Sequence, residues 1–322
     1  MTDPRLTIIA IAKNEGMFLL EWLAHNYAIG VDHVVIGTND CEDGSDALLD
    51  AVARHFPLTH LDNSAPAPGF TIHQRGMARV MEQPEARNSD WLMHIDPDEF
   101  VNIRSADGQF KPFLRSHEAN DAIAICWKNF GNNGRRTWDG GLVTDAFWSC
   151  EDALSNATAH KTVFRADVFE HTTPHMPKGP SKPSDELRLV NAEGKILPND
   201  RLYNARNTGY RFVPETLTWE GAYVAHFMVK SWDLSRMKVH RGSCNKGSDE
   251  RRRPGTGKYK KYNVNRAADF TLQATREARL EWLHKMMAVP EIADLHYGCL
   301  EWFFAMQRQM MRADAEPVAM IG

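Results

Sequence analysis

The first sixty residues alternate apolar runs with amphipathic stretches. Apolar and β-branched residues fill 6–12, 31–36 and 58–61, and these runs predict strands. Between them, apolar side chains recur at three- and four-residue steps over 17–29 and about 46–55, which predicts two helices. The order strand–helix–strand–helix–strand is typical of a parallel sheet covered by helices. We therefore predict an α/β fold with a mostly parallel central sheet flanked by helices.

The same pattern continues along the rest of the chain. Further strands are predicted at 91–95, 122–127 and 161–165, and a late apolar run with one central histidine follows at 222–229. Helical spacing predicts four more helices, at 70–81, 231–239, about 265–287 and 291–312. Residues 172–184 are rich in proline and predict a loop. We divide the chain into an α/β domain over 1–242 and a basic loop with a C-terminal helical extension over 243–322.

Composition and charge limit the class of protein. The chain has 322 residues, of which 43% are apolar and 25% charged, and a net charge of -4, which argues against general nucleic-acid binding. No apolar run approaches the roughly 20 residues of a membrane span, and no signal peptide is visible. The five cysteines are scattered without metal-binding spacing. This pattern favours reduced thiols and a cytoplasmic protein.

Three carboxylates crowd the end of the strand predicted at 91–95. Asp96, Asp98 and Glu99 fall within four residues, and Pro97 cannot continue a ladder. Like charges this close repel unless a cation lies among them. Carboxylate oxygens without nearby cysteine favour Mg²⁺ or Mn²⁺ over Zn²⁺. On these residues alone, a divalent metal site and a plain acidic turn both stay open.

Polar loops follow three of the predicted strands, at 13–16, 38–45 and 96–99. Ligands of parallel α/β sheets bind outside the carboxyl ends of the strands. The three loops are therefore expected to meet at one edge of the sheet and form a ligand site.

Several motifs together resemble one known family. They are Lys13-Asn14-Glu15-Gly16 with Glu21-Trp22, Asn39-Asp40-Cys41-Glu42-Asp43, Asp96-Pro97-Asp98-Glu99-Phe100, and His226-Phe227 with Lys230-Ser231. In this order they resemble bacterial family-2-like glycosyltransferases, in the branch related to glycosyltransferase family 92. Cys41 and Phe227 depart from the usual serine and tyrosine, and neither change removes a metal or phosphate ligand. The resemblance covers residues 8–242 and does not include the C-terminal helices.

The resemblance implies a GT-A fold and a metal-dependent transfer from a nucleoside-diphosphate sugar to a hydroxyl of a glycan or polysaccharide, with inversion. It implies that Asp96, Asp98 and His226 hold Mn²⁺ or Mg²⁺ through an Asp-x-Asp motif. The donor pocket is then expected to be formed by Lys13, Asn14, Glu15, Asn39, Arg75, Asp96 and Lys230. Lys238 and Arg241 are further candidates for the pyrophosphate. For Asn14 and Glu15 the alternative is capping of the next helix, and for Arg75 it is a solvent-facing side chain.

An inverting transfer needs a carboxylate that accepts the proton of the acceptor hydroxyl. Glu151 and Asp152 follow two aromatic residues that suit a sugar, and Asp145 is the rival. The basic segment 246–262 has three interpretations: a lid over the nucleotide, a loose loop, or a surface that touches anionic lipid or polysaccharide.

Two other classes of protein compete with the transferase. One is a non-catalytic glycan- or anion-binding protein on a degenerate transferase fold, which the intact acidic motif disfavours. The other is a nucleotidyltransferase, for which a glycine-rich loop after the first strand is expected. Lys13-Asn14-Glu15-Gly16 is not such a loop.

Overall fold

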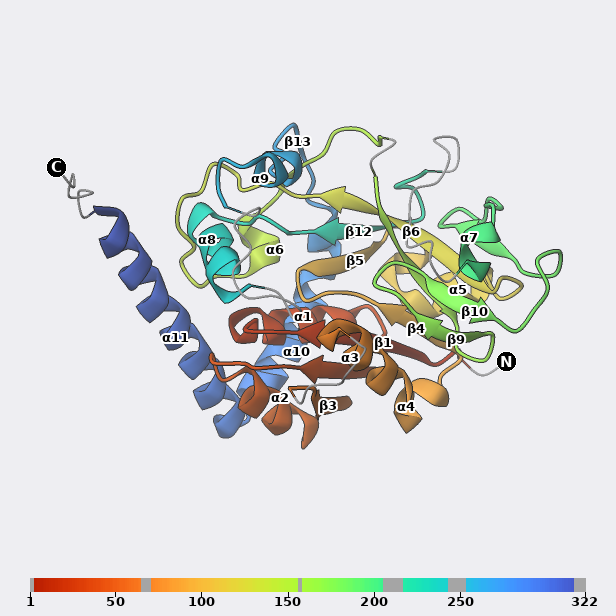
Figure 1. Ribbon diagram of the computed structural model, residues 1–322, viewed down its shortest axis with the longest axis horizontal. Helices are drawn as coiled ribbons and strands as arrows, with labels where there is room; N and C mark the ends of the chain where they lie inside the picture. The colour runs from red at the N-terminus through yellow and green to blue at the C-terminus, as the bar shows by residue number, and fades with distance from the viewer. Residues whose placement is uncertain (1–2, 65–70, 156–157, 205–216, 243–252, 316–322) are drawn as a thin grey trace.

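The computed structural model describes residues 3–64, 71–155, 158–204, 217–242 and 253–315. Within these ranges nine strands form one mixed sheet in which most pairings are parallel (Figure 1). Its parallel half has the order β3–β2–β1–β4. These strands span Leu58–Asp62, His33–Thr38, Leu6–Ala12 and Trp91–His94. The predicted α/β fold class is therefore confirmed.

The second half of the sheet continues from β4 with antiparallel β8 and then β6, β12 and β5. These strands span His160–Arg165, Ala122–Asn129, Ala222–His226 and Glu99–Ile103, and β11 (Leu189–Asn191) also pairs with β6. Strand β5 was missed in the sequence because only a four-residue turn separates it from β4. That turn carries Asp96 and Asp98, so the acidic motif joins the two halves of the sheet.

Helices cover both faces of the parallel half. On one face lie α1 (Gly16–Ala28) and α2 (Ser45–Ala53), and on the other lie α3 (Ile72–Met81) and α4 (Pro84–Arg87). Alternate residues of β1 divide between two hydrophobic clusters. Ile8 packs with α1 and α2, while Ile9 packs with α3. Burying each isoleucine stabilises the fold by about 1.5–3 kcal/mol relative to exposure.

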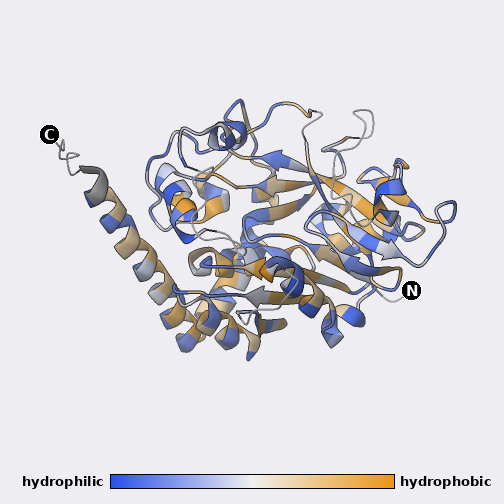
Figure 2. Ribbon diagram, in the orientation of Figure 1, coloured by the Kyte–Doolittle hydropathy of each residue, from blue (hydrophilic) through white to orange (hydrophobic). Residues whose placement is uncertain are grey.

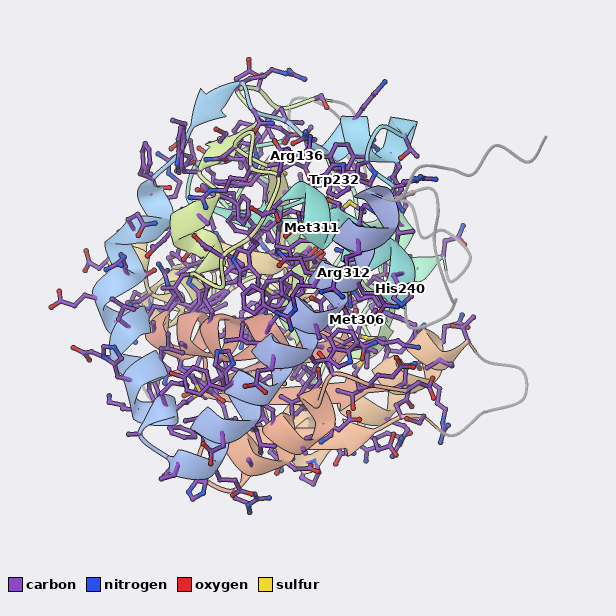
Figure 3. The ribbon with its side chains drawn as sticks, turned by 90° about the vertical axis from the view of Figure 1, so that its left-hand side faces the viewer. Arg136, Trp232, His240, Met306, Met311 and Arg312 are labelled. Atoms are coloured by element: carbon purple, nitrogen blue, oxygen red, sulfur yellow. The ribbon has the colours of Figure 1, made fainter. Side chains whose placement is uncertain are left out.

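The C-terminal helices α10 (Arg276–Met287) and α11 (Pro290–Ala315) pack on α1, and α11 also contacts α2 and α8 (Trp232–Arg241). Figure 3 views the side on which α11 passes α8, with Met311 near Trp232 and Met306 near His240. Helix α10 begins later than predicted, because 3-10 helix η4 (Thr271–Thr275) precedes it. The division of the chain at residue 242 stays a prediction.

One loop prediction was wrong. Within 172–184, β10 (Pro177–Pro180) pairs with β9 (Phe169–Thr172), because its lysine and glycine leave enough backbone groups for a short ladder despite two prolines. The remaining short elements are η1 (Ala106–Gly108), α5 (Phe110–Ser116), α6 (Val143–Ala146), β7 (Ser149–Cys150), α7 (Asp200–Tyr203), α9 (Gly257–Tyr262) and β13 (Ala267–Ala268). Figure 2 shows α9 as largely hydrophilic. Among the helices of the described ranges, none has the length and apolarity to span a membrane.

Candidate functional site

A cavity of about 380 Å³ opens at the carboxyl ends of β1, β4 and β12. The carboxylates Glu15, Asp96 and Asp98 line it. Facing them are basic side chains and histidines: Lys13, Lys238, Arg241, Lys258, His73, His175 and His226. The polar loops after β1 and β4 thus meet at one edge of the sheet, as the strand order predicts. A cavity with both charge signs suits an anion bound together with a cation.

A buried lysine holds the acidic turn. The Lys161 ammonium donates to Asp96 Oδ2 at 2.8 Å and lies 2.9 Å from Glu99 Oε2, and its side chain is fully buried. Glu99 Oε2 also accepts a hydrogen bond from the backbone N–H of Asp96 at 2.7 Å. Burial raises the pKa of Glu99 to about 8 against the opposing effect of Lys161. Burial also acts to raise the pKa of Asp96, but Lys161 overcomes it, so the Asp96 pKa lies below its ordinary value.

Asp98 faces the opposite side of the turn. Its carboxylate accepts a hydrogen bond from Lys238 of α8. Burial acts to raise the Asp98 pKa, but Lys238, His226 and Lys230 together hold it well below the ordinary value, so Asp98 stays ionised. Lys230 is buried over the Phe18 ring with a positive φ of 49°, and burial lowers its pKa to about 8. Lys230 is not among the side chains that line the cavity, but its charge helps to lower the pKa of Asp98.

His226 ends β12, across the antiparallel ladder from Glu99. Its Nδ1 lies 2.9 Å from Asn129 Oδ1, and Asn129 Nδ2 donates to Glu151 Oε1 at 2.8 Å. Because Asn129 donates to Glu151, its oxygen faces His226, so Nδ1 carries the hydrogen and Nε2 keeps its lone pair. Burial lowers the His226 pKa to about 3, and its ring stacks on Trp127 with centroids 4.1 Å apart.

The loop after β1 is tied to its neighbours. Asn14, with a φ of 51°, accepts a hydrogen bond from the backbone N–H of Glu42 at 2.7 Å, which joins the first two polar loops. Arg241 donates to the Lys13 carbonyl and the Glu15 carboxylate. Glu15 occupies the N-cap position of α1 without a side-chain capping bond. Asn39 is fully buried and donates to Asp40 at 3.0 Å.

The structure therefore brings together part of the predicted set. Lys13, Glu15, Asp96, Asp98 and His226 line the cavity. Asn14, Asn39, Arg75 and Lys230 are not among its lining residues.

The three predicted base candidates also lie outside the lining. Asp145 forms a bidentate ion pair with Arg276, and Asp152 pairs with Arg266 at 3.1 Å on the surface. Within the described ranges, hydrogen bonds through Asn129 and His226 connect Glu151 to the site. The roles proposed for these residues stay predictions. Of the basic segment 246–262, residues up to 252 lie outside the described ranges, and Lys258 and Tyr262 of α9 line the cavity.

Sequence reasoning missed Lys161 and His94. Lys161 lies in a strand in which only Val163 and Phe164 are apolar, so the local pattern did not mark it as a buried charge, and its partners depend on the pairing of β8 with β4. His94 ends β4 and is buried, and the apolar run alone gave it no chemical role.

This edge offers a divalent cation part of the predicted donor set, but within the described residues the ligand atoms of Asp96, Asp98 and His226 do not all lie within 4.8 Å of one another. Asp98 is an ionised carboxylate and His226 a neutral imidazole with a lone pair on Nε2, and the exposed part of Asp96 adds a second carboxylate. Carboxylates suit Mg²⁺ or Mn²⁺, and one nitrogen donor does not exclude them. Lys238 would then have to share Asp98 with the ion.

No family model matches the sequence. Two curated relatives are glycosyltransferase family 92 proteins. The one from Oryza sativa subsp. japonica is 25% identical over 170 residues, covering 51% of this chain and 27% of the relative. The one from Ricinus communis is 24% identical over 206 residues, covering 60% and 34%. The predicted resemblance to this family is confirmed, and the chain spans about a third or less of each relative's length.

Solved structures overlap with about half of the chain. A crystal structure of S. aureus TarS shares 13% identity, with a TM-score of 0.32 and coverage of 51% of this chain and 48% of that chain. A glucosyl-3-phosphoglycerate synthase from Mycobacterium tuberculosis, solved with Mn²⁺, uridine diphosphate and phosphoglyceric acid, shares 12% identity, with a TM-score of 0.30 and coverage of 52% and 57%. Sequence identities and TM-scores this low do not bear on the chemistry of this chain.

Proposed function

We propose that this protein is a metal-dependent glycosyltransferase that moves a sugar from a nucleoside-diphosphate sugar to a hydroxyl of a glycan or polysaccharide. The observation that carries the proposal is the cavity itself. It brings the ionised Asp98 and the neutral His226 together with basic side chains at the carboxyl ends of parallel strands. Sequence similarity to family 92 glycosyltransferases supports the same class.

The leaving group of such a transfer is a nucleoside diphosphate, whose growing negative charge must be neutralised. Asp98, His226 and Asp96 are the proposed ligands of Mn²⁺ or Mg²⁺, which when bound supplies Lewis-acid stabilisation of the pyrophosphate. Lys238, Arg241 and Lys258 line the same cavity and supply the remaining positive charge. Arg241 also fixes the Lys13–Glu15 turn, so one side chain links the loop to the anion site.

Inversion requires a carboxylate near the acceptor hydroxyl. Of the three predicted acids, Glu151 is the one that the structure links to the cavity, through Asn129 and His226. Asp145 and Asp152 are held in ion pairs with arginines. We therefore keep Glu151 as the leading candidate for the base.

The test is thermal denaturation with a panel of nucleoside diphosphates, with and without Mn²⁺. We expect at least one nucleotide to raise the Tm in the presence of Mn²⁺, and Asp98→Asn to remove this shift. Asp152→Asn, a surface acid outside the cavity, is the matched control and keeps the shift. An unchanged Tm with every nucleotide would contradict the proposal.

A further inference from the structure

We infer that His73, His94 and Asp96 form a second cation site, which binds a late first-row ion such as Zn²⁺ or Co²⁺ through two imidazoles and one carboxylate. One ligand atom from each of these side chains lies within 4.8 Å of the other two. Ligands 2.0–2.1 Å from a tetrahedral zinc lie about 3.4 Å apart, so closing on an ion requires small side-chain rotations. This set differs from the proposed Asp98–His226 site and shares only Asp96 with it.

The buried side of the site is His94, whose side chain is 2% exposed. Its Nδ1 lies 3.1 Å from the Pro174 carbonyl, which can only accept, so Nδ1 carries the hydrogen. Lys161 Nζ lies 3.4 Å from the same nitrogen, but its hydrogens have closer carboxylate acceptors at 2.8 and 2.9 Å. The lone pair of His94 therefore resides on Nε2.

His94 Nε2 is buried and has no hydrogen-bond partner within the described part of the chain. It lies 3.8 Å from Asp96 Oδ1. An imidazole lone pair and a carboxylate oxygen that face each other repel unless a cation lies between them. A metal-bound histidine also commonly donates a hydrogen bond from its other ring N–H to a backbone carbonyl, as His94 does here.

The two carboxylate oxygens of Asp96 have different neighbours. Its Oδ2 accepts from Lys161, which leaves Oδ1 on the His94 side. The Asp96 side chain is 35% exposed and lines the cavity, so an ion can enter from the cavity and keep a water as a further ligand. Lys161 thus holds the carboxylate in place as an outer partner of the ligand.

The third ligand comes from a different element. His73 lies in the first turn of α3, and its ring meets the His94 ring edge-on with centroids 5.7 Å apart. Two imidazoles and one carboxylate, with an open position, suit Zn²⁺ or Co²⁺ better than Mg²⁺. A bound ion would join α3 to the end of β4.

The test is a Co²⁺ titration of the full chain without nucleotide, followed by visible absorption and by Zn²⁺ competition. We expect one ion per chain, displaced by Zn²⁺. His73→Gln, a change at a half-buried residue, should weaken Co²⁺ binding at least tenfold, with an unchanged Tm in the absence of metal. Asp98→Asn should leave Co²⁺ affinity within about twofold of the unmodified chain.

No saturable Co²⁺ or Zn²⁺ binding would overturn the inference, as would unchanged affinity in His73→Gln. It would also be overturned if Asp98→Asn lost Co²⁺ as strongly as His73→Gln, because the ion would then belong to the Asp98 site. The inference does not depend on donor binding. Asp98→Asn should lose the Mn²⁺-dependent nucleotide shift and keep its Co²⁺ affinity, so failure of one proposal is distinguishable from failure of the other.

Discussion

At the scale of single residues, the chain Glu151–Asn129–His226 decides which nitrogen of the histidine faces the cavity. Glu151 accepts from both the backbone N–H and the side-chain amide of Asn129, at 3.1 and 2.8 Å. The amide is thereby held with its oxygen toward His226. Glu151 can thus act by orienting a ligand, and this role differs from the predicted one of a base.

Glu151→Gln separates these two roles. If Glu151 positions His226, the change weakens Mn²⁺ binding about 10–100-fold, because partners of metal ligands typically contribute this much to affinity. If Glu151 is the base, kcat falls while Mn²⁺ affinity is unchanged. Titration of activity against Mn²⁺ distinguishes the outcomes, and Asp152→Asn is the neighbouring control. No change in either quantity would contradict both roles.

The buried Lys161 gives a second prediction at this scale. Lys161→Met leaves Glu99 and Asp96 without their shared cation, and we expect the free energy of unfolding to fall by about 3–5 kcal/mol. Adding Asp96→Asn should recover part of this loss, because the carboxylate whose pKa Lys161 lowers is then removed with it. The control is Arg54→Met, which breaks a pair with Glu291 in which both side chains are more than half exposed and should cost less than about 1 kcal/mol. Denaturant unfolding measures both, and equal losses would contradict the account.

Residue types near the site were predictable to different degrees. Asp96 and Asp98 were predictable as site residues because three acids within four residues follow an apolar strand. Lys161 lies 65 residues from Asp96, and His73 and His94 gain a shared role only when α3 packs beside β4. Such contacts depend on the strand order, which local periodicity does not contain.

At the scale of elements, the site follows from strands that end at one edge. Strands β1, β2 and β4 run parallel, so their following loops meet, and Asn14 fastens the first loop to the second. The local pattern predicted these strands well because each is a buried apolar run. It missed β5, whose antiparallel partner β12 lies far along the chain, and the β9–β10 hairpin, in which two prolines hid a short antiparallel ladder.

Substitution of Gly16 tests how closely α1 packs against α11. A Cβ at this first residue of α1 would lie 2.5 Å from Cys299 Sγ and 3.0 Å from Asp43 Oδ2. Gly16→Ala should therefore destabilise the protein, by about 1–3 kcal/mol. Gly298, within α11, has no heavy atom near its added Cβ, so Gly298→Ala should stabilise by up to about 1 kcal/mol. Denaturant unfolding measures both signs, and a stabilising Gly16→Ala would refute the close contact.

At the scale of the whole molecule, the fold buries several histidines in their neutral form. Burial lowers the pKa of His25 to about 3 and of His296 to about 4, both well away from the cavity. An unfolded histidine has an ordinary pKa near 6.5. Below that pH the unfolded chain binds protons that the folded chain excludes.

The protein should therefore lose stability on acidification. From pH 6.5 toward pH 4 the free energy of unfolding falls, with a slope that approaches about 1.4 kcal/mol per pH unit for each such histidine. Replacing His296 with leucine removes one of these groups and should flatten the slope by about that amount. Urea unfolding at pH 7, 6 and 5 measures this slope, and an identical slope in His296→Leu would contradict the assignment.

The central claim is that Asp98 and the cavity around it bind a divalent ion and a nucleoside-diphosphate sugar for transfer. The most direct measurement is release of nucleoside diphosphate from a panel of nucleotide sugars, with Mn²⁺ and then with chelator. We predict that one donor is consumed only when Mn²⁺ is present, and that Asp98→Asn lowers the rate at least a hundredfold while Asp50→Asn, at an exposed residue of α2 outside the cavity, does not. Donor turnover that is equal in Asp98→Asn, or absent with every donor, would contradict the claim.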